Sequence, residues 1–192
     1  MENLDFVNNA PNPKNVSPWP TGLRYGLIWG GASILLTLIS FLTNTDPSLP
    51  NTSTVLKFVY GILGLGIAIW CIVMAIKQHR DQELGGYITL GRGMGMGTIV
   101  GLVAGALSGA YMLLHVLVIN PGWGDQMRSA LMEQYETMGL ADDQIEQSMS
   151  MVGFMFNPVF QLVGGLINGV FMGFLIGLIA GAIMKRDAPK GS

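Results

Sequence analysis

The chain has 192 residues, of which 50% are apolar and only 11% are charged, and its formal net charge is −2. Soluble domains average roughly 25% charged residues, so this composition argues against a soluble globular protein. Nucleic-acid binding is also disfavoured, because it needs clustered Lys and Arg and the longest basic run here is Lys185-Arg186. The single cysteine, Cys71, excludes an intrachain disulfide.

Four apolar stretches are long enough, or nearly so, to cross a hydrocarbon core of roughly 30 Å as helices. None of them has the polar face that a helix of a soluble protein shows, so their solvent is expected to be lipid. The sequence therefore predicts an all-α polytopic membrane protein with a four-helix bundle. The predicted parts are a flexible tail over 1–24, a membrane domain over 25–186 with spans at about 25–42, 55–76, 95–119 and 159–184, and a C-terminal tail over 187–192.

The segment 120–158 is too polar to span a membrane. Asn120-Pro121-Gly122 is expected to end the third span. Apolar residues then recur at three- and four-residue spacing, which is typical of one face of an amphipathic helix: Trp123, Met127, Leu131, Tyr135 and Met138. The run Asp143–Glu146 resembles a capping box for a second short helix. The segment is therefore predicted to form an extracytoplasmic helical hairpin that covers the bundle. The alternative is that its methionines form an adaptable docking surface.

Basic residues predict the sidedness, because Lys and Arg are retained on the cytoplasmic side. Eight lie in the two tails and the 77–94 loop, whereas the other side has only Arg128 and Lys57. Both termini are therefore predicted to be cytoplasmic. The eight are Lys14, Arg24, Lys77, Arg80, Arg92, Lys185, Arg186 and Lys190.

Two glycine ladders with a four-residue period occupy the third and fourth spans. They are Gly93, Gly97, Gly101, Gly105 and Gly109, and Gly165, Gly169, Gly173, Gly177 and Gly181. Helices in lipid associate through close van der Waals contact, and a glycine groove lets two backbones approach. The ladders resemble a glycine zipper, and we expect the two helices to pack groove to groove with a right-handed crossing. The alternatives are a seam between copies of the chain and the lining of a pore.

Residues with evident chemistry are few. His115 is expected to be an interfacial side chain rather than a proton relay. Gln161 and Asn168 are expected to form hydrogen bonds between helices, each worth roughly 1 kcal/mol. His79 and Glu83 lie four residues apart and are compatible with a shared metal, but a solvated loop is favoured because two ligands do not make a site. No catalytic, cofactor or metal site is predicted.

Three segments are similar to a known family. They are Arg24-Tyr25-Gly26-Leu27-Ile28-Trp29-Gly30, Gly86-Tyr87-Ile88-Thr89-Leu90-Gly91, and the outer region from Asn120-Pro121-Gly122 to Glu146. Together they make the chain resemble the bacterial domain of unknown function 4199 family, which consists of small membrane proteins with four helices. The resemblance implies a bacterial inner-membrane location, and it implies no functional residues.

Dense helix-packing sequence without visible chemistry favours one function over the others. The leading hypothesis is a non-enzymatic scaffold or accessory subunit, which acts through helix packing with itself or with other membrane proteins. The alternative is a small channel or transporter for an uncharged or unidentified solute. The bilayer itself is an expected partner, and no cofactor or nucleic acid is expected.

Overall fold

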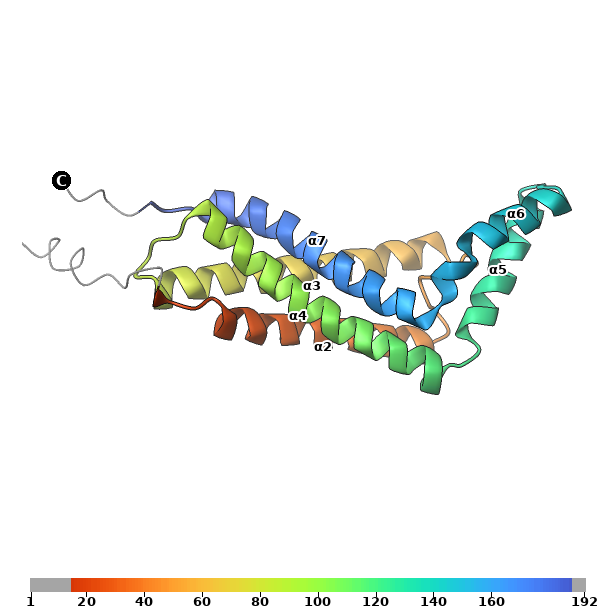
Figure 1. Ribbon diagram of the computed structural model, residues 1–192, viewed down its shortest axis with the longest axis horizontal. Helices are drawn as coiled ribbons and strands as arrows, with labels where there is room; N and C mark the ends of the chain where they lie inside the picture. Colours follow the sequence, from red (N-terminus) through yellow and green to blue (C-terminus); the bar gives the residue numbers. More distant parts are fainter. Residues whose placement is uncertain (1–14, 188–192) are drawn as a thin grey trace, which may run out of the picture.

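The structure is a computed structural model that describes residues 15–187. Four of its helices are long and apolar enough to cross a membrane, and they lie along a common long axis (Figure 1). This arrangement confirms the predicted all-α polytopic fold. The membrane helices are α2 (Trp19–Leu42), α3 (Thr54–Gln78), α4 (Leu90–Leu114) and α7 (Pro158–Met184).

Shorter elements continue or connect these four helices. α3 runs into a π-helical turn, η2 (His79–Glu83), and α4 runs into another, η3 (His115–Ile119). The predicted hairpin is present and projects from one end of the bundle (Figure 1). Its parts are α5 (Trp123–Thr137), α6 (Asp142–Val152) and a final 3-10 turn, η4 (Gly153–Phe156).

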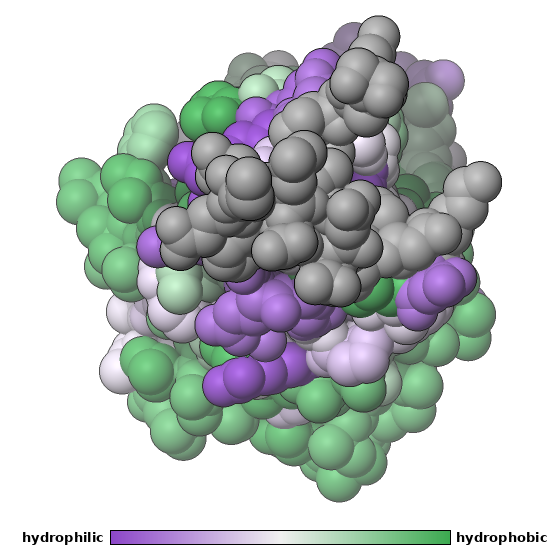
Figure 2. Space-filling model, turned by 90° about the vertical axis from the view of Figure 1, so that its left-hand side faces the viewer, coloured by the Kyte–Doolittle hydropathy of each residue, from purple (hydrophilic) through white to green (hydrophobic). Residues whose placement is uncertain are grey.

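The two ends of the bundle differ in composition. The tail end contains the start of α2, the 84–89 connection and the end of α7, where Ile88 and Arg186 form an isolated antiparallel bridge. Seen from this end, hydrophilic residues gather near the middle and hydrophobic side chains project around them (Figure 2). The hairpin end contains the 43–53 connection and the helices α5 and α6. The hydrophobic perimeter is what a bilayer-spanning bundle presents to lipid.

All four membrane helices begin earlier than predicted, α3 and α7 by a single residue and α2 and α4 by more. α2 begins at Trp19 rather than residue 25, with Pro20 in its first turn, a position that proline favours. Val16 already packs against the core, so the described part of the predicted flexible tail is structured, and residues 1–14 lie outside the described range. α4 begins at Leu90 rather than residue 95, because the Thr89 side chain accepts a hydrogen bond from the Arg92 amide and caps the helix.

The hairpin also differs slightly from its prediction. α6 begins at Asp142, one residue before the predicted capping box, and only Gln144 acts as a cap. Its side-chain oxygen accepts a hydrogen bond from the Ala141 amide at 3.2 Å. Gly139 follows α5 with a φ of 77°, as expected for the residue that ends a helix in the left-handed conformation.

The two glycine ladders face each other in antiparallel register within one chain. A Cβ atom placed on Gly97 would lie 2.6 Å from the Gly177 Cα, and one placed on Gly105 would lie 2.8 Å from the Gly165 carbonyl oxygen. Such distances are too short for any side chain, so the two helices touch through their backbones. These glycine faces are therefore occupied by each other within one chain.

α2 packs against a different face of α4. Three of its four glycines meet branched side chains of α4 one turn apart, and both helices run in the same direction. The pairs are Gly22 with Ile99, Gly26 with Val103, and Gly30 with Leu107. α3 is attached less completely, because its buried residues all lie between Ala68 and Ile76. The first half of α3 therefore diverges from the compact unit of α2, α4 and α7.

The ladder contact predicts unequal effects of two neighbouring alanine substitutions. Gly97→Ala should destabilise the fold by about 1–3 kcal/mol, because its methyl group would overlap the α7 backbone. Gly95→Ala is the matched control, since a Cβ there meets nothing within 4 Å. Thermal unfolding in detergent should show a lower midpoint for the first variant only. Equal midpoints would contradict the close contact.

Candidate ligand cavity

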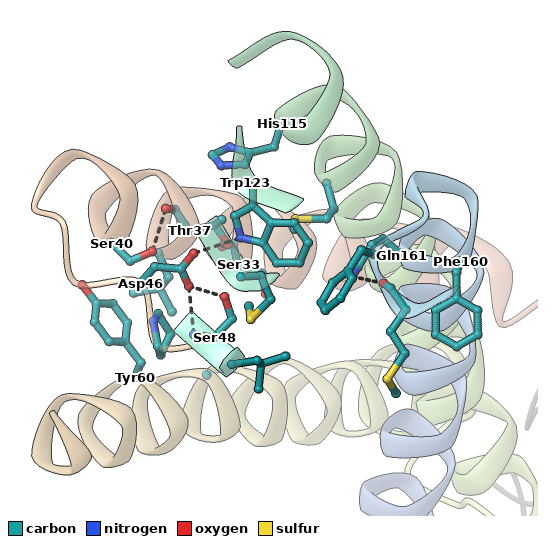
Figure 3. A pocket seen from close by; sticks show the side chains of 18 of the residues that line it. Ser33, Thr37, Ser40, Asp46, Ser48, Tyr60, His115, Trp123, Phe160 and Gln161 are labelled. Atoms are coloured by element: carbon teal, nitrogen blue, oxygen red, sulfur yellow. Dashed lines mark hydrogen bonds between the residues drawn. The ribbon is translucent and has the colours of Figure 1, made fainter. Parts of the chain in front are cut away.

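The divergence of α3 leaves a cavity of about 740 Å³ at the hairpin end (Figure 3). All four membrane helices contribute wall residues, and α5 and η4 close it from the hairpin side. On the α3 side the wall includes Gly64, where no side chain fills the space. The cavity exists because α3 is buried only in its second half.

One wall is a row of hydroxyl groups on α2. Ser33, Thr37 and Ser40 follow at four- and three-residue spacing and so share one helix face. The Thr37 hydroxyl donates to the Ser33 carbonyl oxygen at 3.0 Å, and the Ser40 hydroxyl donates to the Thr37 carbonyl oxygen at 2.8 Å. Each of these two donors is satisfied within the helix, and the hydroxyl oxygens still have acceptor capacity.

Asp46 lies on the cavity wall in the connection between α2 and α3. One carboxylate oxygen accepts from the Ser48 amide at 2.9 Å and from the Ser48 hydroxyl at 2.6 Å. The other accepts from the indole Nε1–H of Trp123 at 3.3 Å. Figure 3 shows Asp46 between Ser48 and the Trp123 ring. These bonds hold the carboxylate in place with neutral donors only.

The predicted apolar face of α5 closes the cavity. Trp123 is 4% exposed and Met127 is 8% exposed, and both pack with Val116 at the end of the bundle. Leu131 packs beside them, and Tyr135 lines the cavity. Met138, the last residue of the predicted face, is 65% exposed because α5 has by then extended beyond the bundle.

His115 is not the lipid–water boundary side chain that the sequence suggested. It is 2% exposed and lies in the cavity wall, where its Nδ1 is 3.1 Å from the Tyr111 hydroxyl. The Phe41 ring packs edge-on against the imidazole, with centroids 5.0 Å apart. The π-helical turn η3 begins at His115, and such turns shift side chains out of regular helical register.

The two polar residues of α7 do not form the predicted hydrogen bonds between membrane helices. The Gln161 amide donates instead to the Met155 carbonyl oxygen of η4 at 2.7 Å, because η4 ends with free carbonyl groups just before α7. Asn168 forms no side-chain hydrogen bond with residues of the described range. It lines a second cavity of about 390 Å³, which shares Ser33 and Gly64 with the first and therefore adjoins it.

A second polar cluster lies at the tail end. His79 is 0% exposed, so the expectation of a solvated loop is wrong. Arg92 Nε donates to His79 Nε2 at 3.0 Å, and His79 Nδ1 therefore donates to Glu83 at 2.7 Å. Glu83 also accepts from the Thr21 hydroxyl, and Arg92 also donates to the Val16 carbonyl oxygen. The cluster joins α2, η2 and α4, and its groups satisfy one another.

The structure does not support a metal site at His79 and Glu83, because a third ligand is missing among the described residues. Within residues 15–187 no three His, Cys, Asp or Glu side chains are grouped so that they could hold a metal ion. The η2 turn instead places His79 in contact with both Arg92 and Glu83.

The tail-end cluster predicts a difference between two acidic residues of the same turn. Glu83→Ala should lower the free energy of unfolding by about 1–3 kcal/mol, because it leaves the buried His79 donor without an acceptor. Asp81→Ala is the control, since Asp81 is 37% exposed and pairs with its neighbour Arg80. Denaturation in detergent should separate the two variants. An equal loss in both would show that burial of the cluster is unimportant.

The sequence indicated some of these cavity residues but not the cavity. Trp123, Met127 and Leu131 were predicted to face the bundle, and His115 and Gln161 were noted for their polarity. Asp46 and the α2 hydroxyl row were missed. The spacing of Ser33, Thr37 and Ser40 on one face was a usable signal, whereas no local pattern marks Asp46.

The fold and the site define the class of this protein as an α-helical multi-pass membrane protein with four membrane helices. Within that class, a family model described as "Protein of unknown function (DUF4199)" matches residues 24–186. The chain therefore belongs to this family, as the resemblance of its three segments indicated. Comparisons with curated proteins and with solved structures found no match.

Proposed function

We propose that this protein is a non-enzymatic membrane protein that binds an amphipathic small molecule in the cavity at the hairpin end. The observation that carries the proposal is the cavity itself. Its volume of about 740 Å³ lies within the range of roughly 300–1,000 Å³ typical of small-molecule sites. Its wall combines many apolar side chains with a few polar groups held in place by hydrogen bonds, as ligand sites do.

The position of the cavity favours a ligand that comes from the bilayer. All four membrane helices contribute to its wall, and the first half of α3 leaves apolar side chains such as Phe58 and Ile62 exposed. The adjoining second cavity extends between the membrane helices to Asn168 and Met172. An apolar tail fits this inner space, and a polar head fits beside Asp46 and Trp123.

The support for a scaffold role is weaker than the sequence suggested. That hypothesis rested on the glycine ladders as packing surfaces, and these surfaces are occupied within one chain. The transporter alternative gains support, since a transporter must first bind its solute. Binding is the step that we propose here.

Filling the cavity should abolish ligand binding. A Cβ at Gly64 meets nothing within 4 Å, so Gly64→Leu places its side chain in the cavity without a backbone clash. Gly66→Leu is the matched control, because Gly66 is equally open but does not line the cavity. Saturable fluorescence of the neutral probe N-dodecyl dansylamide is measured with each protein in lipid nanodiscs. We expect wild type and Gly66→Leu to bind it and Gly64→Leu to lose most of the saturable signal.

Two results would overturn this proposal. The first is a wild-type protein that shows no saturable binding above that of empty nanodiscs. The second is Gly64→Leu binding as well as Gly66→Leu, which would place the probe elsewhere on the membrane surface of the protein.

We also propose that the protein lies in the bacterial inner membrane with its tail end in the cytoplasm. The support is the distribution of charge: Arg80, Arg92 and Arg186 lie at the tail end, whereas the hairpin is rich in acidic residues and has only Arg128 as a basic one. A green fluorescent protein fused to the C-terminus should fluoresce, and alkaline phosphatase fused there should be inactive. The reverse pattern would overturn the orientation.

A further inference from the structure

We propose that the cavity at the hairpin end selects lipophilic cations, with an ammonium-type head beside Asp46 and an apolar tail in the adjoining cavity. The inference rests on the proposed binding function and names the chemical class of its ligand. It starts from the charge of the wall. Asp46 is the only acidic residue among the wall residues, and no Lys or Arg is among them.

Asp46 forms no salt bridge within the described part of the chain, and the imidazole of His115 is the one basic side chain among the wall residues of its cavity. The Asp46 carboxylate takes part in none of the salt bridges there, which join His79 with Glu83, Arg80 with Asp81, and Lys185 with Asp187. Its hydrogen-bond donors are the Ser48 amide, the Ser48 hydroxyl and the Trp123 indole, all of them neutral. A carboxylate has about four acceptor positions, so one remains for a ligand. A partly desolvated anion of this kind attracts a cation more strongly than an exposed one does.

Aromatic rings near Asp46 add a second attraction for a cation. Trp123 is held by its bond to Asp46, and the Tyr60 hydroxyl is paired with the Thr45 hydroxyl at 2.9 Å. Phe156 also lines the cavity, whereas Phe160 lies on its other side, away from Asp46 (Figure 3). The faces of Trp, Tyr and Phe rings attract ammonium groups, and a carboxylate together with aromatic rings is a common way to hold quaternary ammonium.

One basic side chain lies close to this set but does not occupy it. The Arg128 guanidinium stacks on the Phe156 ring, 5.8 Å from its centroid. Arg128 is not a wall residue of this cavity and lines a separate groove of the hairpin instead.

The adjoining cavity accounts for the apolar part of the ligand. It reaches toward the middle of the bundle and is lined by Trp29, Leu65, Ala68 and Met172. Asp46 lies in the connection between α2 and α3, at the end of the bundle. A polar head bound there would lie near the level of the lipid headgroups. The ligand would therefore bind with its head toward the membrane surface and its tail toward the membrane interior. An amphiphile has this same orientation in the lipid bilayer.

The test compares three amphiphiles with the same dodecyl chain and different heads. Dodecyltrimethylammonium, dodecyl maltoside and dodecyl sulfate are used below their micelle-forming concentrations to displace N-dodecyl dansylamide from the full-length protein in nanodiscs. In wild type, the ammonium compound should displace the probe at about tenfold lower concentration than the maltoside, and the sulfate should be weakest. Asp46→Asn should remove the preference and still bind the neutral probe.

A control variant tests whether the preference for a cation depends on Asp46 itself or only on the net charge of the protein. Asp125→Asn removes an exposed acidic residue in the first turn of α5 that does not line the cavity, and it should keep the wild-type preference. Equal displacement by the ammonium and maltoside compounds in wild type would overturn cation selectivity and leave the binding function standing. A preference that survives in Asp46→Asn, or is lost equally in Asp125→Asn, would also overturn it. Absence of any probe binding to wild type would instead reject the proposed function.

Discussion

Backbone contact between α4 and α7 is the constraint on which the other features of this bundle depend. In lipid the hydrophobic effect does not drive helices together, so their association depends on contact area and closeness. Glycine at five successive levels of each helix lets the two backbones touch along most of their length. α2 then packs its own glycines against a second face of α4. The result is a compact three-helix unit, and α3 is the helix that remains less attached.

The partial attachment of α3 makes the two ends of the bundle unlike. At the tail end α3 buries one face between Ala68 and Ile76 and continues into the η2 turn, whose His79 and Glu83 bond to α4 and α2. At the hairpin end the helix diverges, and the space beside it becomes the cavity that α5 covers. One end is therefore closed by polar contacts, and the other encloses a chamber suited to a ligand.

The family to which the chain belongs is described only as a protein of unknown function, so chemistry must come from the site. The site contains a fixed carboxylate, a row of hydroxyls and several aromatic rings within a mostly apolar wall. These are groups that orient and hold a molecule. The carboxylate distinguishes the cavity from a simple gap between helices, because three hydrogen bonds fix a charged group in its wall.

The sequence by itself determined the four spans, the two glycine ladders and the amphipathic face of α5. Each is a local pattern, because residues three and four positions apart lie on the same face of a helix. Only the tertiary structure decided that the ladders meet each other, since a glycine groove does not specify its partner. It also decided which polar groups converge. Asp46 meets Trp123 across 77 positions of sequence, and Thr21 meets Glu83 across 62. Such pairs depend on how far α3 diverges from the other helices and on where the π-helical turns η2 and η3 direct their side chains. Neither property can be predicted from a short stretch of sequence.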